Sequence, residues 1–286
     1  MDDRMGEVSW GLKERVIMGA GLSLLDMATD LFVIVGHMGN EETMGYGWSL
    51  LGMIVASMAC QLLLVYGQHR KKPAKMLGEM LIVLTGLKPG FDAKNVISGK
   101  EMEEHNAVDA KIEMVLSKLG EMFCESVPWC ILQLFVILKS GDRNESALVS
   151  VAVSALTAGF SSASVAFDYD VDPQKRRQSP DFYGYIPDAK SRTVIFGCMP
   201  LNSSLLLLVW GLGVAMLLLV KRRYVVFYLA GDMALYLLQK VARGDFFYWM
   251  PVAGALGLVM SRVMVKTIAD FTTSEDHKSW AGCTGW

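Results

Sequence analysis

The sequence has few of the residues that build catalytic, metal and disulfide sites. Only four of its 286 residues are histidine and five are cysteine. No two cysteines have CxxC spacing, and no histidine has the spacing of a zinc site or a catalytic triad. The GxSxG, HExxH and P-loop motifs are also absent. The sequence therefore predicts a protein that is not an enzyme, has no cofactor and no metal, and uses its cysteines as small apolar residues.

Charge of one sign is also lacking, because the formal net charge is only −2. No basic face with interleaved aromatic residues is present, so we expect no nucleic-acid partner. The acidic run at Asp168, Asp170 and Asp172 lacks the glycine and the late glutamate of a calcium loop, and we interpret it as a solvated helix end. The polar stretch before residue 16 does not have the pattern of a cleaved signal peptide.

Apolar residues, in contrast, are abundant. They make up 52% of the chain, and the mean hydropathy is +0.34. Several apolar runs approach the roughly 20 residues that a membrane-spanning helix needs. The sequence predicts an all-α, polytopic membrane protein with a single transmembrane domain over residues 1–286.

The apolar runs differ in length, which separates full spans from shorter pieces. Full spans are predicted at about 16–37, 46–66, 120–138, 147–167, 193–220 and 246–266. Residues 76–87 are too few to span, so we expect a re-entrant or interfacial half-helix. Residues 224–239 are either a second re-entrant segment or a further span. The total is six or seven spans with one or two re-entrant half-helices, and the charged residues 92–118 are expected in water or at the interface.

The predicted span at 120–138 carries polar residues that a lipid-facing helix would exclude. Glu121 and Glu125 are four residues apart and share a helix face, with Ser126 beside them and Gln133 close to the same stripe. An ionised carboxylate is costly in a bilayer core, so such a group usually faces a bundle interior or a wet cavity. Pro128 removes one backbone hydrogen bond, and we expect the helix to bend there.

Residues 16–37 repeat this pattern with Asp26, Thr29 and Asp30. Four carboxylates on two helices favour a polar pathway over a static buried network, although both explain the pattern. The pathway would carry ions, protons or lipid headgroups, and composition does not choose among them. Asp232 and Arg262 are predicted to form a second polar station.

The basic loops predict the orientation of the spans. Basic residues before residue 16, at 69–75 and at 175–192 lie on one side if 76–87 is re-entrant, and that side is expected to be cytoplasmic. The basic residues 221–223 then fall on the opposite side, against this rule. The order of two spans, a short apolar piece and one span occurs at 16–138 and again at 147–266, before a short polar tail at 267–286. Three full spans per half would make an inverted repeat.

The predicted span at 120–138 contains a motif that is similar to one in a known family. ESVPWCILQLFVIL resembles the E-S-x-P-Q-x-x-L-Q helix of the XK family, which includes the XK-related phospholipid scramblases. The matching residues are Glu125, Ser126, Pro128, Leu132 and Gln133, while Trp129 replaces the first glutamine. The first span is similar to the D-x-x-T-D helix of that family, and together the likeness covers about residues 16–170. The second half is similar in layout, and pieces such as KPGFDA and FYGYIPD are similar to multi-span proteins of algae and other protists.

The resemblance implies a scramblase that lets phospholipid headgroups cross the membrane without ATP. The residues expected to line the lipid path are Asp26, Thr29, Asp30, Glu121, Glu125, Ser126 and Gln133. Membrane phospholipids are then the expected partners, and we expect the plasma membrane rather than internal membranes. Two alternatives are an ion channel or transporter that uses the same carboxylates, and a non-catalytic subunit that binds another membrane protein.

Overall fold

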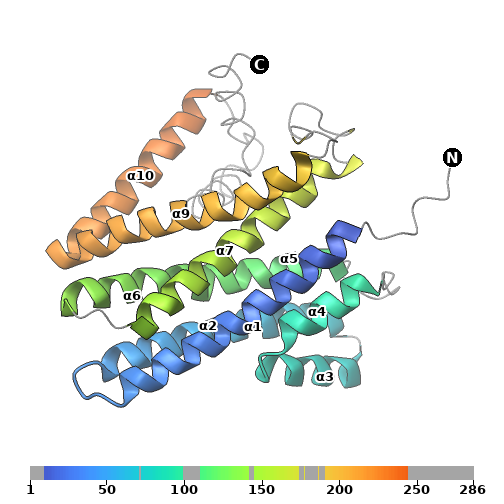
Figure 1. The fold of residues 1–286 in the computed structure, drawn as a ribbon, viewed down its shortest axis with the longest axis horizontal. Helices are drawn as coiled ribbons and strands as arrows, with labels where there is room; N and C mark the ends of the chain where they lie inside the picture. Colours follow the sequence, from blue (N-terminus) through green and yellow to red (C-terminus); the bar gives the residue numbers. More distant parts are fainter. Residues whose placement is uncertain are drawn as a thin grey trace.

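The computed structural model describes residues 10–70, 72–98, 110–141, 145–173, 177, 186 and 191–243, and every regular element in these ranges is a helix (Figure 1). The helices are α1 Trp10–Met38, α2 Met44–His69, α3 Pro73–Leu84, α4 Lys88–Ile97, α5 Ala110–Glu121, α6 Val127–Ser140, α7 Glu145–Val171, α9 Ser191–Val220 and α10 Arg222–Arg243. A π-helical turn, η1 Met122–Ser126, joins α5 to α6. The all-α prediction is confirmed for these residues.

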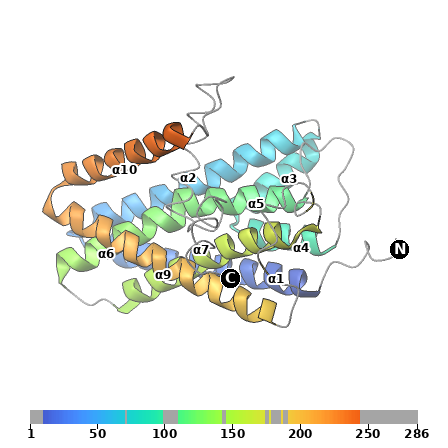
Figure 2. The same cartoon turned by 90° about the horizontal axis from the view of Figure 1, so that it is seen from above.

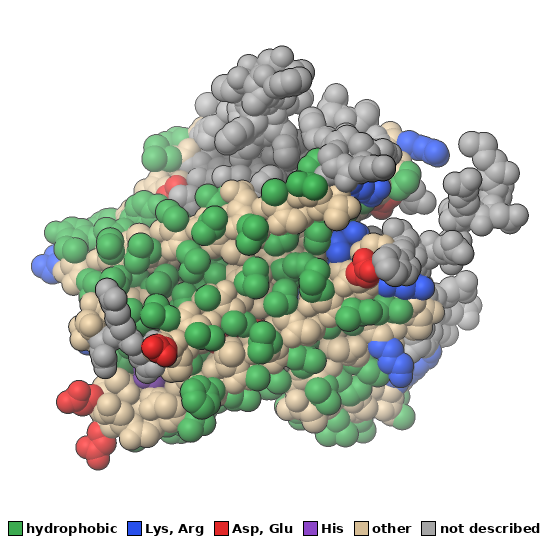
Figure 3. All heavy atoms as spheres, in the orientation of Figure 1, with side chains coloured by type: hydrophobic (Ala, Val, Ile, Leu, Met, Phe, Trp, Pro, Cys, Tyr) green, Lys and Arg blue, Asp and Glu red, His purple; other side chains and the backbone are tan. Residues whose placement is uncertain are grey.

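Five of the helical stretches are long and apolar enough to cross a membrane. They are Gly11–Met38, Met44–His69, Ile112–Ser140, Glu145–Asp168 and Arg192–Val220. Large side chains such as Phe32, Leu63 and Val209 point outward from them and are about 70% exposed. Figure 3 shows hydrophobic side chains across the middle of the visible face. Such a surface suits a lipid environment, so the chain is an integral multi-pass membrane protein.

The third span is longer than predicted, because it begins at Ile112 instead of residue 120. The irregularity expected at Pro128 takes the form of η1, which lies just before this proline in the first turn of α6. Proline lacks an N–H and clashes with the carbonyl four residues earlier, and a π-helical turn relieves both problems.

The expectation that residues 92–118 lie in water or at the interface is corrected for part of that segment. Asp92 on α4 and Lys118 on α5 are both buried, and residues from Ile112 on belong to the third candidate span, whereas Lys94 on α4 is exposed. Charge between apolar runs favours solvent, but the fold buries Asp92 against Lys88 and Lys118 beside Ser161. α4 packs against α1 and α5, and α5 packs against α2.

α3 and α4 form a helical hairpin that covers one end of α1 and α2 (Figure 1). Their 12 and 10 residues are too few to span a bilayer. Gly86 joins them with a φ of +72°, in the left-handed region that favours glycine. The half-helix expected at 76–87 is therefore a helix, but its insertion into the bilayer stays a prediction.

The helix ends lie at two opposite ends of the bundle. α1, α5 and α9 begin at the end of the bundle where α2 and α7 finish (Figures 1 and 2). Figure 3 shows most of the visible Lys and Arg side chains gathered at this end. At the same end Arg15 of α1 pairs with Asp168 of α7. This arrangement agrees with the predicted grouping of the basic loops, while the identity of the cytoplasmic side stays a prediction.

Small residues let α7 pack closely against its neighbours. A Cβ atom on Gly159 would lie 2.7 Å from the backbone oxygen of Pro200 and 2.7 Å from the backbone nitrogen of Ser204, so α7 and α9 touch through their backbones. Close packing therefore explains the run of small residues at 158–164.

The last part of the chain is described only up to α10, which packs against α9. α10 corresponds to the apolar piece expected at 224–239, and neither crossing nor re-entry is established for it. The span predicted at 246–266, Arg262 and the tail at 267–286 lie outside the described residues. The sixth and seventh spans and the inverted repeat stay predictions.

Candidate functional site

Two aspartates of α1 face two serines of α7 at the centre of the bundle. Asp26 and Asp30 are 2% and 0% exposed. The Ser154 hydroxyl donates to Asp26 Oδ1, and the Ser150 hydroxyl donates to Asp30 Oδ1 over 2.8 Å. Both pairs are four residues apart on antiparallel helices, so each aspartate lies beside one serine, and Ser154 also lies 3.5 Å from Asp30 Oδ1. Hydroxyl donors stabilise the carboxylates but do not neutralise them.

Two glutamates of the third span join this group. Glu121 and Glu125 are buried, and Glu121 interacts electrostatically with Asp26 while Glu125 interacts with both aspartates. We call Asp26, Asp30, Glu121 and Glu125 the membrane cluster. The structure thus brings together all four of the carboxylates that the sequence placed on two separate helices.

A small cavity lies on the side of the membrane cluster that faces α2. Its volume is about 30 Å³, and it is lined by Ser23, Ser57 and Gln61 together with Glu121 and Glu125. Ser23 lies beside Glu121 and Ser57 beside Glu125, but neither hydroxyl makes a hydrogen bond with good geometry. The cavity is therefore polar and has room for about one water molecule.

Lys118 is a buried cation next to the membrane cluster that the sequence reasoning missed. Its Nζ donates to the Ser161 hydroxyl over 3.4 Å and interacts electrostatically with Glu121. A Cβ atom on Gly19 would lie 2.8 Å from this nitrogen, so the absent side chain gives the ammonium its space. The signal was present, because Lys118 is three residues before Glu121 and shares its helix face.

Trp129, which replaces the first glutamine of the motif described above, is buried rather than facing a path. It is 0% exposed, and its Nε1 donates to the Ser150 hydroxyl over 2.9 Å. Ser150 in turn donates to Asp30. Trp129 therefore orients the serine that binds Asp30. Ser150, Ser154 and Trp129 were not among the predicted site residues.

Several buried polar atoms around the cluster have no hydrogen-bond partner within the described protein. They include Asp30 Oδ2, the Ser126 hydroxyl and both polar atoms of the Gln133 side chain. A buried polar group without a hydrogen bond costs roughly 1–3 kcal/mol of folding free energy. A polar ligand that bonds to these atoms would recover part of that energy. Thr29 differs, because its hydroxyl donates to the backbone oxygen of Asp26 on its own helix.

The proposed second polar station is separate from the membrane cluster. Asp232 is half-buried on α10, and α7 and α9 lie between α10 and α1 (Figure 1). Its expected partner, Arg262, lies outside the described residues. The pairing of these two residues stays a prediction.

Comparison with known proteins places the chain in a family. A family model described as XK-related protein matches residues 15–186, which is more than half of the chain and contains the whole membrane cluster. Neither the curated proteins nor the solved structures contain a match. The chain belongs to the XK-related family.

Proposed function

We propose that this protein moves phospholipids between the two leaflets of a membrane without an energy source. The observation that carries the proposal is the membrane cluster, in which four carboxylates lie together inside membrane-spanning helices beside unpaired polar atoms. Membership of the XK-related family supports it, because that family includes phospholipid scramblases.

The physical argument starts from the barrier to lipid exchange. A phospholipid headgroup does not cross hydrocarbon readily, because its charges lose their water. Carboxylates of the membrane cluster would attract the amine of a zwitterionic headgroup, and Lys118 would attract its phosphate. The acyl chains would stay in lipid, along the apolar outer faces of the helices. The movement is downhill and needs no ATP.

The described structure is a closed form of such a path. The cavity beside Glu121 and Glu125 holds about one water molecule, which is far too little for a headgroup. α1, α2 and η1 must therefore separate for lipid to pass. Gln133, whose amide has no hydrogen-bond partner among the described residues, would offer both a donor and an acceptor to a passing headgroup.

The direct test is reconstitution. The purified protein is placed in liposomes that carry a fluorescent lipid in both leaflets, and a membrane-impermeant reductant then bleaches the outer leaflet. Scrambling predicts bleaching well past half, with a trapped soluble dye remaining protected. Bleaching that stops near half in vesicles that contain folded protein would contradict the proposal.

Variants then test the path itself. Asp26→Asn and Glu125→Gln replace each acid by an amide that cannot ionise, at nearly constant shape, and we expect each to slow lipid exchange by roughly tenfold, which is about 1.4 kcal/mol of barrier. Glu41→Gln is the matched control, because Glu41 is exposed in the loop between α1 and α2. Thermal unfolding of each variant shows whether it is folded. If folded Asp26→Asn and Glu125→Gln exchange lipid at the wild-type rate, the membrane cluster is not the path.

An ion channel or transporter is the second candidate, favoured by the same gathering of carboxylates, which would concentrate cations. It predicts voltage-dependent ion flux in liposomes without lipid exchange. A non-catalytic subunit would show neither activity alone and would be extracted in a stable complex with another membrane protein.

The proposal includes a cytoplasmic N-terminus and a plasma-membrane location. The gathering of basic side chains at the end where α1 begins supports this orientation. An epitope tag at the N-terminus should be stained at the cell periphery only after the cells are permeabilised. Staining of intact cells would reverse the orientation.

A further inference from the structure

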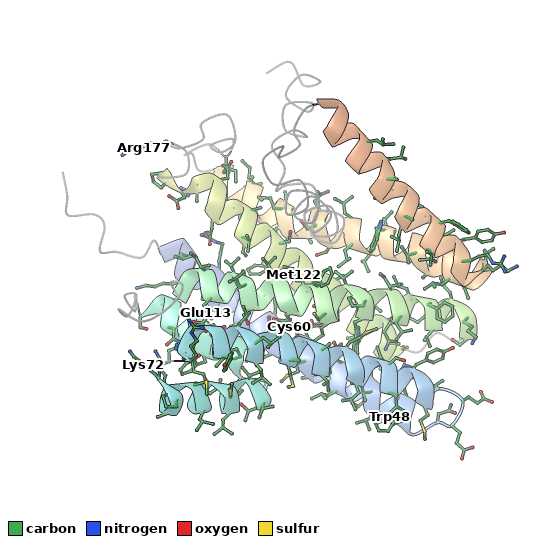
Figure 4. The ribbon with its side chains drawn as sticks, turned by 180° about the vertical axis from the view of Figure 1, so that it is seen from behind. Trp48, Cys60, Lys72, Glu113, Met122 and Arg177 are labelled. Atoms are coloured by element: carbon green, nitrogen blue, oxygen red, sulfur yellow. The ribbon has the colours of Figure 1, made fainter. Side chains whose placement is uncertain are left out.

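A second group of charged side chains, buried except for the partly buried Glu113, lies where α2, α3, α4 and α5 meet. It consists of His69, Glu79, Lys88, Asp92 and Glu113, and we call it the hairpin cluster. Figure 4 shows Glu113 near the C-terminal end of α2 and beside the α3 hairpin. None of these residues belongs to the membrane cluster, and the proposed lipid path does not use them.

Three carboxylates of the hairpin cluster converge on one ammonium. Lys88 Nζ lies 3.2 Å from Glu79 Oε2, 2.8 Å from Asp92 Oδ1 and 2.7 Å from Glu113 Oε1. Lys88 is 1% exposed, so its charge is fully removed from solvent. Burial raises the pKa of Asp92 to about 6 although Lys88 lowers it, and the nearby Glu113 and Glu79 raise it further. The site therefore holds more negative charge than one ammonium balances easily.

His69 faces these carboxylates from the end of α2. It is 3% exposed, and its Nε2 lies 3.1 Å from Glu79 Oε1. Neither ring nitrogen makes a hydrogen bond with good geometry in the described protein. A buried imidazole without a hydrogen bond, aimed at a carboxylate, has the position of a metal ligand.

The donor atoms are already close together. One ligand atom each from His69, Glu79 and Glu113 lie within 4.8 Å of one another. Lys88 Nζ contacts Oε2 of Glu79 and Oε1 of Glu113. Glu79 Oε1 faces His69 Nε2, and Glu113 Oε2 accepts a long 3.5 Å hydrogen bond from Gln68. These second oxygens of the two glutamates are the ones that would bind a cation.

We propose that His69, Glu79 and Glu113 bind a divalent transition-metal ion, with zinc the best match. Imidazole nitrogen and carboxylate oxygen are both ligands that zinc binds in proteins, and three protein ligands on a tetrahedral ion leave a fourth position for water. Calcium is a poorer match, because it prefers six to eight oxygen ligands. The ion would neutralise the excess carboxylate charge, and Lys88 would hold the second oxygens as a positioning residue.

Binding requires a small rearrangement. Ligand atoms of tetrahedral zinc lie about 3.3 Å apart, so the donors would have to move together by about an ångström. Glutamate side chains can make this movement by rotation. The bound ion would join the C-terminal end of α2 to α3 and α5, and so would fix the α3–α4 hairpin on the bundle. This inference does not depend on lipid transport.

The test uses the full-length protein in detergent, stripped with a chelator and then titrated with zinc chloride by calorimetry. Cobalt(II) is a second probe, because a tetrahedral cobalt site with nitrogen and oxygen ligands absorbs visible light. We expect saturable zinc binding, with the affinity reduced at least about tenfold in His69→Gln and in Glu79→Gln. His37→Gln is the matched control, because His37 is also a buried histidine but lies at the other end of α1 and α2.

Each outcome decides the proposal. Loss of zinc affinity and of the cobalt absorption in His69→Gln and Glu79→Gln, with both retained in His37→Gln, supports the site. If either substitution prevents folding, Glu113→Gln on α5 provides the third ligand position. Absence of zinc binding by the wild type, or equal binding by the wild type and the folded ligand variants, would overturn it. Lipid exchange is not the readout, so failure here leaves the proposed function untouched.

Discussion

The membrane cluster and the hairpin cluster both bury several carboxylates, but they satisfy them differently. Asp26 and Asp30 accept hydrogen bonds from serine hydroxyls, whereas Glu79, Asp92 and Glu113 converge on the ammonium of Lys88. A hydroxyl supplies a hydrogen bond without an opposite charge, whereas an ammonium supplies both. The membrane cluster, whose acids face hydroxyls, can therefore still attract a polar ligand. The hairpin cluster, whose acids face Lys88, mainly holds helices together.

The largest expected effect is the loss of Lys88. Lys88→Met keeps the length of the side chain but leaves the buried Glu79 and Asp92 and the partly buried Glu113 without their ammonium, and we expect a loss of roughly 3–5 kcal/mol in the free energy of unfolding. Thermal unfolding in detergent at pH 7.5 measures it. Lys94→Met is the matched control, because Lys94 is exposed on the same helix. Equal stability of the two variants would mean that the hairpin cluster does not hold α4 in place.

The next effect depends on pH. The pKa of Asp92 is raised to about 6 in the folded protein from 3.8, so the folded state binds a proton more tightly than the unfolded state. Its contribution to stability is present below about pH 4 and is lost as the pH rises through 6, by about 3 kcal/mol for a shift of about two units.

Asp92→Asn should flatten this part of the stability profile. Unfolding free energies of wild type and variant between pH 4 and pH 7 provide the comparison, and their difference cancels titrations elsewhere in the chain. Parallel profiles in that window would show that Asp92 does not titrate as the structure indicates.

A smaller effect is expected at the membrane cluster. Ser154→Ala removes the hydroxyl that binds Asp26, and we expect a loss of roughly 1–3 kcal/mol, less than for Lys88→Met. Ser146→Ala is the control, because Ser146 lies outside the cluster near the start of the same helix. If Ser154→Ala lost more unfolding free energy than Lys88→Met, the membrane cluster rather than the hairpin cluster would contribute more to stability.

The last prediction concerns a cross-link and is measured by lipid exchange. The Sγ atoms of Cys60 on α2 and Cys124 in η1 are 3.5 Å apart (Figure 4 labels Cys60). Mild oxidation should join them, and the disulfide should slow lipid exchange if α2 and η1 must separate. The Cys60→Ser variant, treated in the same way, should be unaffected. Failure to form the disulfide would place α2 and η1 further apart than described.

The sequence predicted the membrane cluster because its signals are local. Asp26 and Asp30, and Glu121 and Glu125, are each four residues apart within apolar runs, so the helical period alone places each pair on one face. The meeting of the two pairs followed from the cost of exposing carboxylates to lipid.

The hairpin cluster could not be predicted in the same way. Its members come from four helices, and Glu113 and Lys88 are 25 residues apart in the chain. Charged residues in a segment between spans usually indicate solvent, and only tertiary packing shows that these are buried. The serine partners on α7 were missed for a related reason, since a serine-rich helix also fits close packing.

The π-helical turn has a consequence for how this span tolerates change. An α-helix turns about 100° per residue, so positions four apart drift by about 40° at each step. Glu121, Glu125, Trp129 and Gln133 follow such a four-residue step, and the wider turn of η1 counteracts the drift, which keeps all four buried. Deletion of one residue within 122–126 would remove the extra residue of this turn, restore a regular helix and leave the half that follows in nearly its present orientation. If η1 became a regular α-helix without a deletion, that half would rotate by about 100°, and Trp129 and Gln133 would turn away from the bundle together.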